Sequence, residues 1–292
     1  MKTLILGAGG LLGRHLVAEW QARGLAVTGL THDDCDITDA VRLEDIFTRP
    51  WDIVINAAAI CNFDACEQDP MGTGAVNRDA PLDLARRCAA RGALFVQFSS
   101  DYVLRGEREV LWTENDAPDP LSAYGRQKAE LERTVPQLCP RSLIIRLSWL
   151  FGHEGRTFLS LLPLLLLREE TVRVAAGKTG RCLYAPDAAH WIRLLATGGH
   201  TGLFHLANDG TMSWECFAAR CLERWPTLGL EPSCRHLLEV PYETLGPNGS
   251  KRPHHSALAL DKISALFPPG PRNWTEALDD YLSVLKSFAV AP

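Results

Sequence analysis

Residues 4–13 read Leu4-Ile5-Leu6-Gly7-Ala8-Gly9-Gly10-Leu11-Leu12-Gly13, a short apolar run that leads into a glycine-rich turn. The apolar run predicts a buried strand, and residues 14–20 beyond the glycines have the periodicity of a helix. Glycines at this spacing permit a tight turn, a close approach of a pyrophosphate to the backbone, and close packing of helix on strand. The first helical turn adds unpaired N–H groups and a positive dipole. We therefore expect a dinucleotide to bind at Gly7, Gly10, Leu11, Leu12 and Gly13, with an ordinary strand-to-helix connection as the alternative.

Strand-like and helical segments alternate after this unit. The strand-like segments are residues 26–30, 52–59, 94–98 and 143–147, and the helical ones are residues 40–47, 80–91 and the stretch around Tyr124. This alternation is typical of a doubly wound parallel sheet, so we expect an α/β Rossmann fold. We expect residues 1–150 to form an NAD(P)-binding domain, completed by about residues 182–208. About residues 151–181 and 209–292 would then form a smaller C-terminal substrate-binding lobe.

The composition argues against several classes of function. A net charge of −5 over 292 residues, without a basic block, gives no reason to expect nucleic acid or an anionic membrane as partner. Nine cysteines without a CxxC pair argue against a disulfide framework and a thiolate zinc site. His205, His254 and His255 lack a convincing metal-binding spacing, so we expect no metal. The apolar run 158–167 is too short to span a bilayer, and no secretory leader is evident, so we expect a cytoplasmic protein.

The residues after the second predicted strand bear on the choice of cofactor. An NAD-specific fold places an acidic residue there on the adenosine ribose, and this chain has Thr31 and His32 instead. We therefore expect NADPH to be accepted at least as well as NADH. Asp36 or Asp39 caps the next helix, or alternatively Asp36 and Ile37 contact the adenine. The small side chains of Ala57, Ala58 and Ala59 end a predicted strand and leave room for a flat cofactor.

Tyr124 and Lys128 form a YxxxK pattern. On a helix the two side chains lie on one face, where the ammonium could lower the pKa of the phenol from about 10 and make it a general acid. Ser100 and Asp101 follow the strand at 94–98, so they emerge at the same sheet edge as the glycine turn. A serine hydroxyl there could hold a substrate oxygen beside Tyr124. The pattern also occurs by chance on solvent-exposed helices, so its meaning depends on the other motifs.

Together, the motifs resemble those of the dTDP-4-dehydrorhamnose reductase family of extended short-chain dehydrogenases/reductases. They are GxxGxxG at 7–13, CDITD at 35–39, NAAA at 56–59, Ala75-Val76-Asn77, SSDYV at 99–103, YGRQK at 124–128, RLSWLFG at 146–152 and KRPHHSALALDK at 251–262. The resemblance implies that Ser100 and Tyr124 bracket a 4-keto oxygen. It also implies that Lys128 binds the nicotinamide ribose and tunes the tyrosine, and that Asp101 and Trp149 contact the sugar.

The chain departs from the family pattern in two places. Gly177-Lys178-Thr179-Gly180-Arg181-Cys182 stands where the family has an acidic-Gln-Gly-x-Pro-Thr segment, and Leu104-Arg105-Gly106 replaces the usual residues after the DYV motif. Both places lie near the expected sugar and nucleotide, so they put the identity of the substrate in question more than the fold. Some relatives bind magnesium between subunits through a position that is His15 here, so the metal is not carried over.

The sequence thus predicts reduction of a nucleotide-linked 4-keto-6-deoxy sugar, dTDP-4-dehydro-L-rhamnose or a close relative, by NADPH, with NADH as a second donor. The expected catalytic residues are Ser100, Asp101, Tyr124 and Lys128. The expected substrate-binding residues are Ser100, Asp101, Trp149 and Arg252, where Arg252 belongs to a basic segment that could meet a diphosphate or be a solvated loop. The alternatives are a nucleotide-sugar epimerase or dehydratase, and a non-catalytic NADP-binding regulatory subunit. We expect a monomer or a homodimer.

Overall fold

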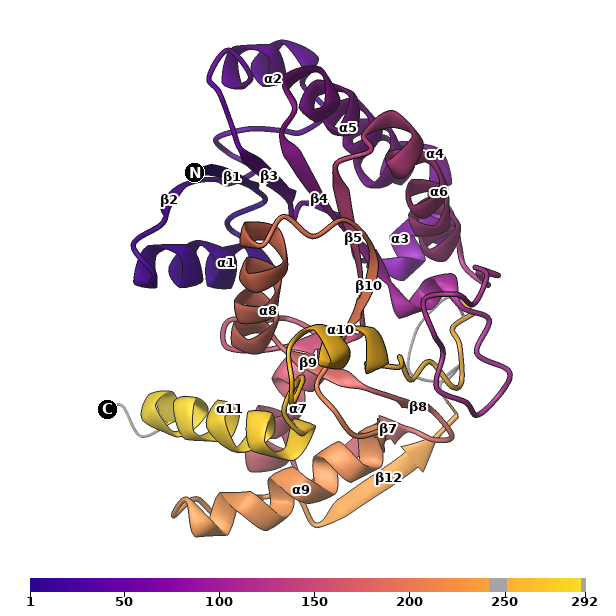
Figure 1. The fold of residues 1–292 in the computed structure, drawn as a ribbon. Coiled ribbons are helices and arrows are strands. Elements are labelled where there is room, and N and C mark those ends of the chain that lie inside the picture. Colours follow the sequence, from indigo (N-terminus) through magenta and orange to yellow (C-terminus); the bar gives the residue numbers. More distant parts are fainter. Residues whose placement is uncertain (242–250, 290–292) are drawn as a thin grey trace.

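The structure is a computed structural model that describes residues 1–241 and 251–289 of the chain. Its centre is a six-stranded parallel sheet in the order β10-β5-β4-β3-β1-β2 (Figure 1). The strands are β1 (Lys2–Leu6), β2 (Ala26–Leu30), β3 (Ile53–Asn56), β4 (Leu94–Ser100), β5 (Ser142–Leu147) and β10 (Gly202–Leu206). The first strand, β1, lies inside the sheet, with β2 on one side of it and β3, β4, β5 and β10 in succession on the other. This order confirms the predicted doubly wound α/β fold.

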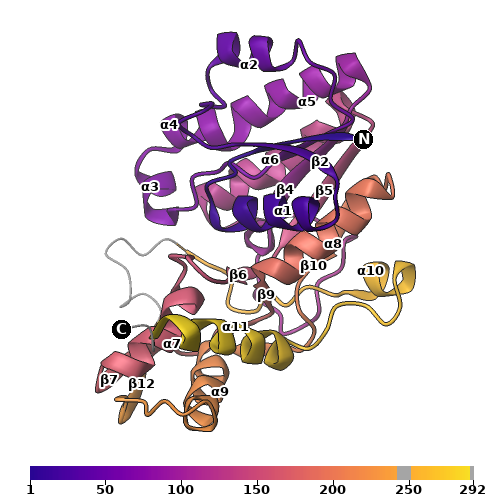
Figure 2. The same ribbon diagram turned by 90° about the vertical axis from the view of Figure 1, so that its left-hand side faces the viewer.

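Helices cover both faces of this sheet, as Figures 1 and 2 show. The helices α1 (Leu11–Ala22) and α8 (Ala185–Thr197) pack against each other on one face, and α2 (Ala40–Ile46), α5 (Ala80–Arg91) and α6 (Ala123–Leu138) lie on the other. Alternate side chains of β1 reach both cores, since Ile5 packs with Leu16 of α1 whereas Leu4 packs with Leu84 of α5. A strand that is buried on both faces needs an unbroken apolar run, which is why residues 4–6 could be assigned from the sequence.

Other elements lie below the sheet in Figure 1 and surround a separate apolar core. The helices are α7 (Phe158–Arg168), α9 (Trp214–Thr227) and α11 (Trp274–Ala289). The strand pairs are β6 (Trp149–Phe151) with β9 (Cys182–Tyr184), β7 (Thr171–Ala175) with β12 (His236–Val240), and β8 (Thr179–Gly180) with β11 (Met212–Ser213). The short elements are α3 (Phe63–Gln68), α4 (Pro70–Gly74), the π-helix η1 (Ala75–Asp79), the 3₁₀ turn η2 (Asp101–Val103) and α10 (Asp261–Leu266).

The chain returns from this second core to the sheet through β10. Its register on β5 runs from Gly202 opposite Leu143 to Leu206 opposite Leu147. These residues lie within the segment, about 182–208, that we expected to complete the NAD(P)-binding domain. The boundaries proposed for the two domains stay a prediction.

Strand β4 extends beyond its predicted end at residue 98. Its pairing with β5 continues through Ser99 opposite Arg146 and Ser100 opposite Leu147. Ser99 is 4% exposed, and its hydroxyl donates a hydrogen bond to the Glu132 carboxylate of α6, so the strand can hold a polar side chain in the interior. Ser100 is therefore the last residue of a strand and is not part of a loop. Two further boundaries differ from the prediction, because α1 already begins at Leu11 and β3 ends at Asn56.

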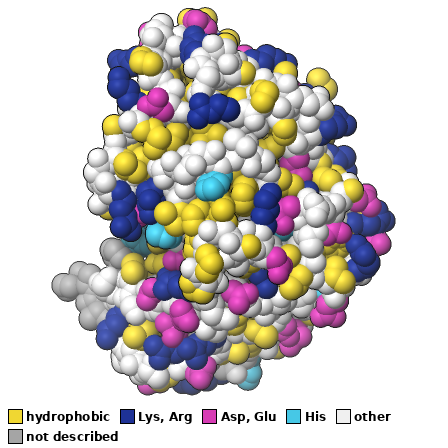
Figure 3. All heavy atoms as spheres, viewed as in Figure 1, with side chains coloured by type: hydrophobic (Ala, Val, Ile, Leu, Met, Phe, Trp, Pro, Cys, Tyr) yellow, Lys and Arg dark blue, Asp and Glu magenta, His cyan; other side chains and the backbone are white. Residues whose placement is uncertain are grey.

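Basic and acidic side chains are interspersed on the face of the molecule shown in Figure 3. This mixture agrees with the small net charge of −5. Within residues 1–241 and 251–289, no helix has the length and apolar character needed to cross a membrane. The absence of nucleic-acid and membrane partners stays a prediction.

Candidate active site

The glycine turn lies at the carboxyl edge of the sheet, between β1 and α1. Gly7 has a φ of +79°, and a side chain on it would overlap the backbone of Ala58, which follows the neighbouring strand β3. A side chain on Gly13 would overlap the backbone of Gly7, so glycine is required there for α1 to approach the turn. At Gly10 the nearest atom to an added Cβ lies 3.4 Å away. This open cradle of backbone beside Ala57, Ala58 and Ala59 fits a dinucleotide pyrophosphate.

The end of β2 carries an acidic residue that the sequence analysis missed. Asp34 accepts hydrogen bonds from the Thr31 backbone N–H at 2.9 Å and from the Thr31 hydroxyl at 2.7 Å. These bonds hold the pKa of Asp34 below its usual value. The acid lies three residues beyond the position at which the pattern places it, so a fixed spacing could not reveal it. The Asp34 side chain nevertheless lies beside Thr31 at the end of the strand, because residues 32–34 form a turn.

Two roles were predicted for residues 36–39, capping of the next helix and contact with the adenine, and the structure tests the first of them. Asp39 caps α2 by accepting from the N–H groups of Val41 and Arg42, both at 3.0 Å. Asp36 instead accepts from the backbone and hydroxyl of Thr38, both at 2.8 Å. Ile37 is 4% exposed and packs in the core under α2. Contact of Asp36 and Ile37 with an adenine stays a prediction.

Tyr124 and Lys128 lie on the buried face of α6, 7% and 2% exposed. Ser122 caps this helix by accepting from the N–H of Gly125 at 3.1 Å. A side chain on Gly125 would overlap the Tyr102 carbonyl oxygen, so this glycine lets α6 approach η2 closely. Phe63 packs edge-on against the Tyr124 ring, with 5.0 Å between ring centroids. The start of α6 is thereby fixed beside Ser100 and Asp101.

The electrostatics of Tyr124 differ from the prediction. Burial raises the pKa of Tyr124 well above its usual value, and the neighbouring Cys61 and Asp101 add to the effect. Burial lowers the pKa of Lys128, whose ammonium lies 5.5 Å from the Tyr124 ring centroid. The prediction that Lys128 lowers the pKa of the phenol is wrong for this structure, because desolvation opposes ionisation of both groups. The phenol therefore keeps its proton, which is the form that a general acid needs.

Ser100 and Asp101 are joined to each other and to a distant segment. The Ser100 hydroxyl donates to Asp101 Oδ1 at 2.9 Å and accepts from the Tyr102 backbone N–H at 3.2 Å. The Ser256 hydroxyl donates to Asp101 Oδ2 at 2.6 Å. Asp101 is 2% exposed, and burial raises its pKa to about 6, against the hydrogen bonds from both serines and the positive charge of Lys178. Ser256 lies in the 251–262 motif, but the motif alone did not indicate this contact.

Trp149 and Arg252, the two remaining predicted residues, lie at the border between the two cores. Trp149 follows by two residues Leu147, the β5 residue opposite Ser100. Its indole ring lies so close to Gly180 that a side chain there would overlap it, and it meets Trp214 edge-on at 6.0 Å. The Arg252 guanidinium lies 4.4 Å from the ring centroid of Phe63, the residue that packs on Tyr124. Arg252 is therefore connected to Tyr124 through Phe63, whereas Trp149 packs against residues of the second core.

Behind this site, a buried ion pair connects α6 to the sheet. Arg146 of β5 donates to both carboxylate oxygens of Glu132, at 2.8 and 2.7 Å, and the two side chains are 1% and 6% exposed. Ser99 donates to the same carboxylate at 2.5 Å. His205 is fully buried beside Arg146, and burial together with that positive charge lowers its pKa to about 3, so the imidazole is neutral. In the described part of the chain, no group of three or more His, Cys, Asp or Glu could hold a metal ion.

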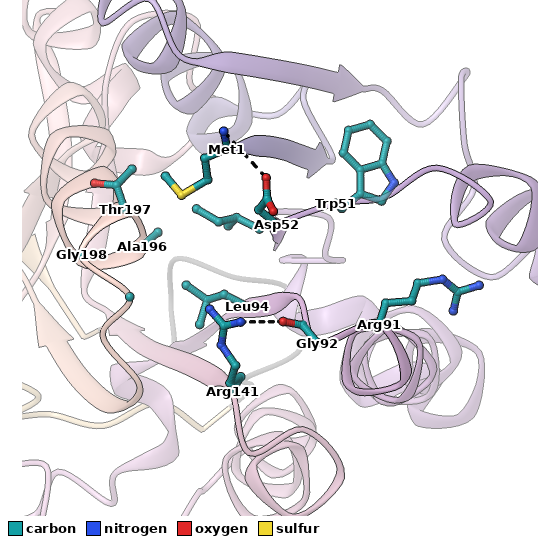
Figure 4. Close-up of a pocket in the computed structure, with 12 residues that line it drawn as sticks. Met1, Trp51, Asp52, Arg91, Gly92, Leu94, Arg141, Ala196, Thr197 and Gly198 are labelled. Carbon is teal, nitrogen blue, oxygen red and sulfur yellow. Dashed lines mark hydrogen bonds and ion pairs between the residues drawn. The ribbon is translucent and has the colours of Figure 1, made fainter.

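A cavity of about 520 Å³ lies at the opposite, amino edge of the sheet (Figure 4). Its charged groups are engaged with one another or with backbone, since the Met1 amine lies 3.8 Å from Asp52 and Arg141 donates to the Gly92 carbonyl at 2.6 Å. None of the predicted site residues lines it. Ligands of open α/β sheets bind at the carboxyl edge, so the glycine turn, Ser100 and Tyr124 define the candidate active site.

Comparison with known proteins covers both halves of the chain. The profile of the RmlD substrate binding domain family matches residues 1–287. The dTDP-4-dehydrorhamnose reductase of Streptomyces griseus is 33% identical over 302 residues, which cover 100% of this chain and 96% of that protein. The dTDP-4-keto-6-deoxy-D-glucose reductase of Streptomyces niveus is 31% identical over 289 residues, which cover 98% of each.

A solved structure gives the same relationship in three dimensions. The dTDP-4-dehydrorhamnose reductase of Bacillus anthracis in complex with NADP superposes with a TM-score of 0.89 at 26% identity. The superposition covers 97% of this chain and 100% of that chain. The similarity therefore includes the second core as well as the nucleotide-binding sheet.

Proposed function

The chain belongs to the RmlD substrate binding domain family, and from this premise we propose that it reduces the 4-keto group of a nucleotide-linked 6-deoxy sugar with NADPH. The observation that carries the proposal is the convergence of Ser100, Asp101 and Tyr124 beside the glycine cradle. The Streptomyces relatives are named for two different dTDP-linked 4-keto-6-deoxy sugars, so this class of substrate is what they share. Within it, dTDP-4-dehydro-L-rhamnose is our first candidate.

NADPH bound in the glycine cradle would supply the hydride. The residues of the chain have the remaining tasks, which are to hold the keto oxygen and to deliver a proton to it. We assign the proton to Tyr124, because burial keeps its phenol protonated. Ser100 and Asp101 polarise the carbonyl, and Lys128 holds the nicotinamide ribose. Trp149 offers an apolar wall to one sugar face, and Arg252 a positive charge to the diphosphate.

The NADP bound to the Bacillus anthracis relative supports NADPH as the donor. We expect kcat/KM for NADPH to be at least equal to that for NADH, although the Asp34 carboxylate lies near the expected 2′-phosphate. Replacing Asp34 by Asn should raise the NADPH to NADH ratio, because a negative charge is removed. Steady-state kinetics with both donors measure the ratio. A more than tenfold preference of the wild-type protein for NADH, about 1.4 kcal/mol, would contradict the assignment.

Absorbance of NADPH tests the reaction itself against a panel of nucleotide-linked 4-keto sugars. A reductase consumes one NADPH for each 4-hydroxy sugar formed. An epimerase or dehydratase would convert the sugar without net oxidation of the cofactor, and a regulatory subunit would bind NADPH without turnover. We further propose that the enzyme acts in the cytoplasm as a monomer or homodimer, which cell fractionation and sedimentation would test.

A further inference from the structure

The segment 254–256 contacts both of the places where the chain departs from the family pattern. In the first place, the Gly106 carbonyl accepts a hydrogen bond from the His255 backbone N–H at 3.0 Å. In the second, the Thr179 carbonyl accepts from the Ser256 backbone N–H at 3.0 Å. The backbone of this segment is therefore held from two sides, directly beside Ser256.

The Ser256 side chain connects this segment to the catalytic turn. Ser256 is fully buried, and its hydroxyl donates to Asp101 Oδ2 at 2.6 Å. The Ser100 hydroxyl donates to the other oxygen, Asp101 Oδ1, at 2.9 Å. Asp101 is 2% exposed, so its carboxyl depends on donors within the protein for these hydrogen bonds.

Two donors on different oxygens fix the orientation of the Asp101 carboxyl. The terminal torsion of an aspartate has broad energy minima, so a carboxyl held by one donor alone can rotate. With Ser256 on Oδ2, rotation would leave a buried oxygen without a partner, which costs more free energy than a hydrogen bond usually contributes. Oδ1 therefore stays beside Ser100, and the Ser100 oxygen stays at the position that we assign to the keto group.

We propose that Ser256 is a positioning residue for the reduction, because it holds the Asp101 carboxyl, and through it the Ser100 hydroxyl, in the orientation that the keto group requires. This inference rests on the proposed function. Ser256 acts only through Asp101, so loss of its hydroxyl should slow the chemical step and leave NADPH binding unchanged. Gly106 and Thr179 then influence the catalytic turn from a distance, since they hold the segment that carries Ser256.

The Ser256→Ala variant of the full-length protein tests the role in the reaction. We expect kcat for the nucleotide-linked keto sugar to fall by about tenfold or more, because small displacements of catalytic groups are costly. Single-turnover kinetics measure this step, and titration should show a nearly unchanged Kd for NADPH. Ser256→Thr keeps a hydroxyl and should restore kcat. The control, Ser142→Ala, should leave kcat unchanged, because Ser142 is equally hidden at 2% exposure but begins β5 at the opposite edge of the sheet.

A double-mutant cycle in urea unfolding tests the contact itself without any substrate. The cycle compares Ser256→Ala, Asp101→Ala and the variant that carries both changes. Each single variant loses the hydrogen bond between the two side chains, and the double variant loses it only once. The loss in free energy of unfolding should therefore be smaller in the double variant than the two single losses together.

The outcomes separate this inference from the proposed function. Additive losses in the cycle would overturn the inference whatever the protein reduces. A non-additive cycle together with an unchanged kcat in Ser256→Ala, or with a kcat that Ser256→Thr does not restore, would also overturn it, because the contact would then serve stability alone.

If the wild-type protein reduces no nucleotide-linked keto sugar, the proposed function fails, while the cycle still decides whether Ser256 holds Asp101. Circular dichroism identifies a folding defect in Ser256→Ala. Ser256→Cys then takes its place in both measurements, because a thiol fills the space of the hydroxyl but is only a weak donor.

Discussion

At the scale of single residues, the state of the Tyr124 phenol is set by its surroundings more than by its helical neighbour. Burial keeps it protonated, so Tyr124→Phe removes a proton donor and leaves the ring packed on Phe63. We expect kcat to fall by roughly 10²–10⁴-fold, the usual contribution of a general acid, with NADPH affinity nearly unchanged. Single-turnover kinetics and cofactor titration measure the two quantities. If more than about a tenth of the turnover remained, Asp101 would become the candidate acid.

The buried Glu132–Arg146 ion pair leads to a prediction about the stability of the protein against unfolding. Glu132→Ala leaves the guanidinium of Arg146 buried at 1% exposure without its carboxylate. Breaking a buried ion pair in this way costs about 3–5 kcal/mol, and urea unfolding should show it as a lower midpoint. The control is Glu107→Ala, because Glu107 pairs with Arg105 at the surface and solvent screens both charges. Equal midpoints for the two variants would mean that the buried pair contributes little.

At the scale of elements, the contact between α6 and η2 sets the distance between Tyr124 and Ser100. A methyl group on Gly125 would collide with the Tyr102 carbonyl, so Gly125→Ala should push the helix away from the turn. We expect kcat to fall by about tenfold or more, because small displacements of catalytic groups are costly. Gly74→Ala in α4 is the matched control, since its added methyl group would make only ordinary contacts at 3.7 Å or more. Similar kcat values for both variants would argue against this role of the contact.

The elements also show how far the sequence could be interpreted. The strands and helices around the glycine turn were predictable. A strand that is buried on both faces needs a continuous apolar run, and such a run is visible in the sequence at residues 4–6. The extension of β4 through Ser99 was not predictable, since it depends on Glu132, 33 residues away. Ser256 donates to Asp101 from an even more distant segment, 155 residues away. The pKa of Tyr124 was predicted in the wrong direction because helical spacing gives the nearest charge but not the burial.

At the scale of the whole molecule, the site is assembled from both halves of the chain. Ser100 and Tyr124 come from the sheet and its helix, whereas Ser256, which donates to Asp101, comes from a segment beyond residue 150. Trp149 is the first residue of β6, the strand that follows β5 in the sequence. Binding energy from the nucleotide end of a substrate could therefore be used to align its keto group with Ser100 and Tyr124. A substrate without the nucleotide would lose this alignment.

This arrangement predicts that the nucleotide-linked keto sugar is reduced with a much higher kcat/KM than the free sugar. Trp149→Ala should lower kcat/KM for the nucleotide-linked form more than it weakens NADPH binding, because we assign the indole to the sugar and not to the cofactor. Arg252→Met should narrow the difference between the two substrates, since it removes a charge for the diphosphate. Kinetics with both forms of one sugar, and NADPH titration of each variant, measure these effects. Equal reduction of the free and nucleotide-linked sugars by the wild-type protein would contradict the prediction, because the residues beyond 150 would then contribute nothing to recognition of the nucleotide.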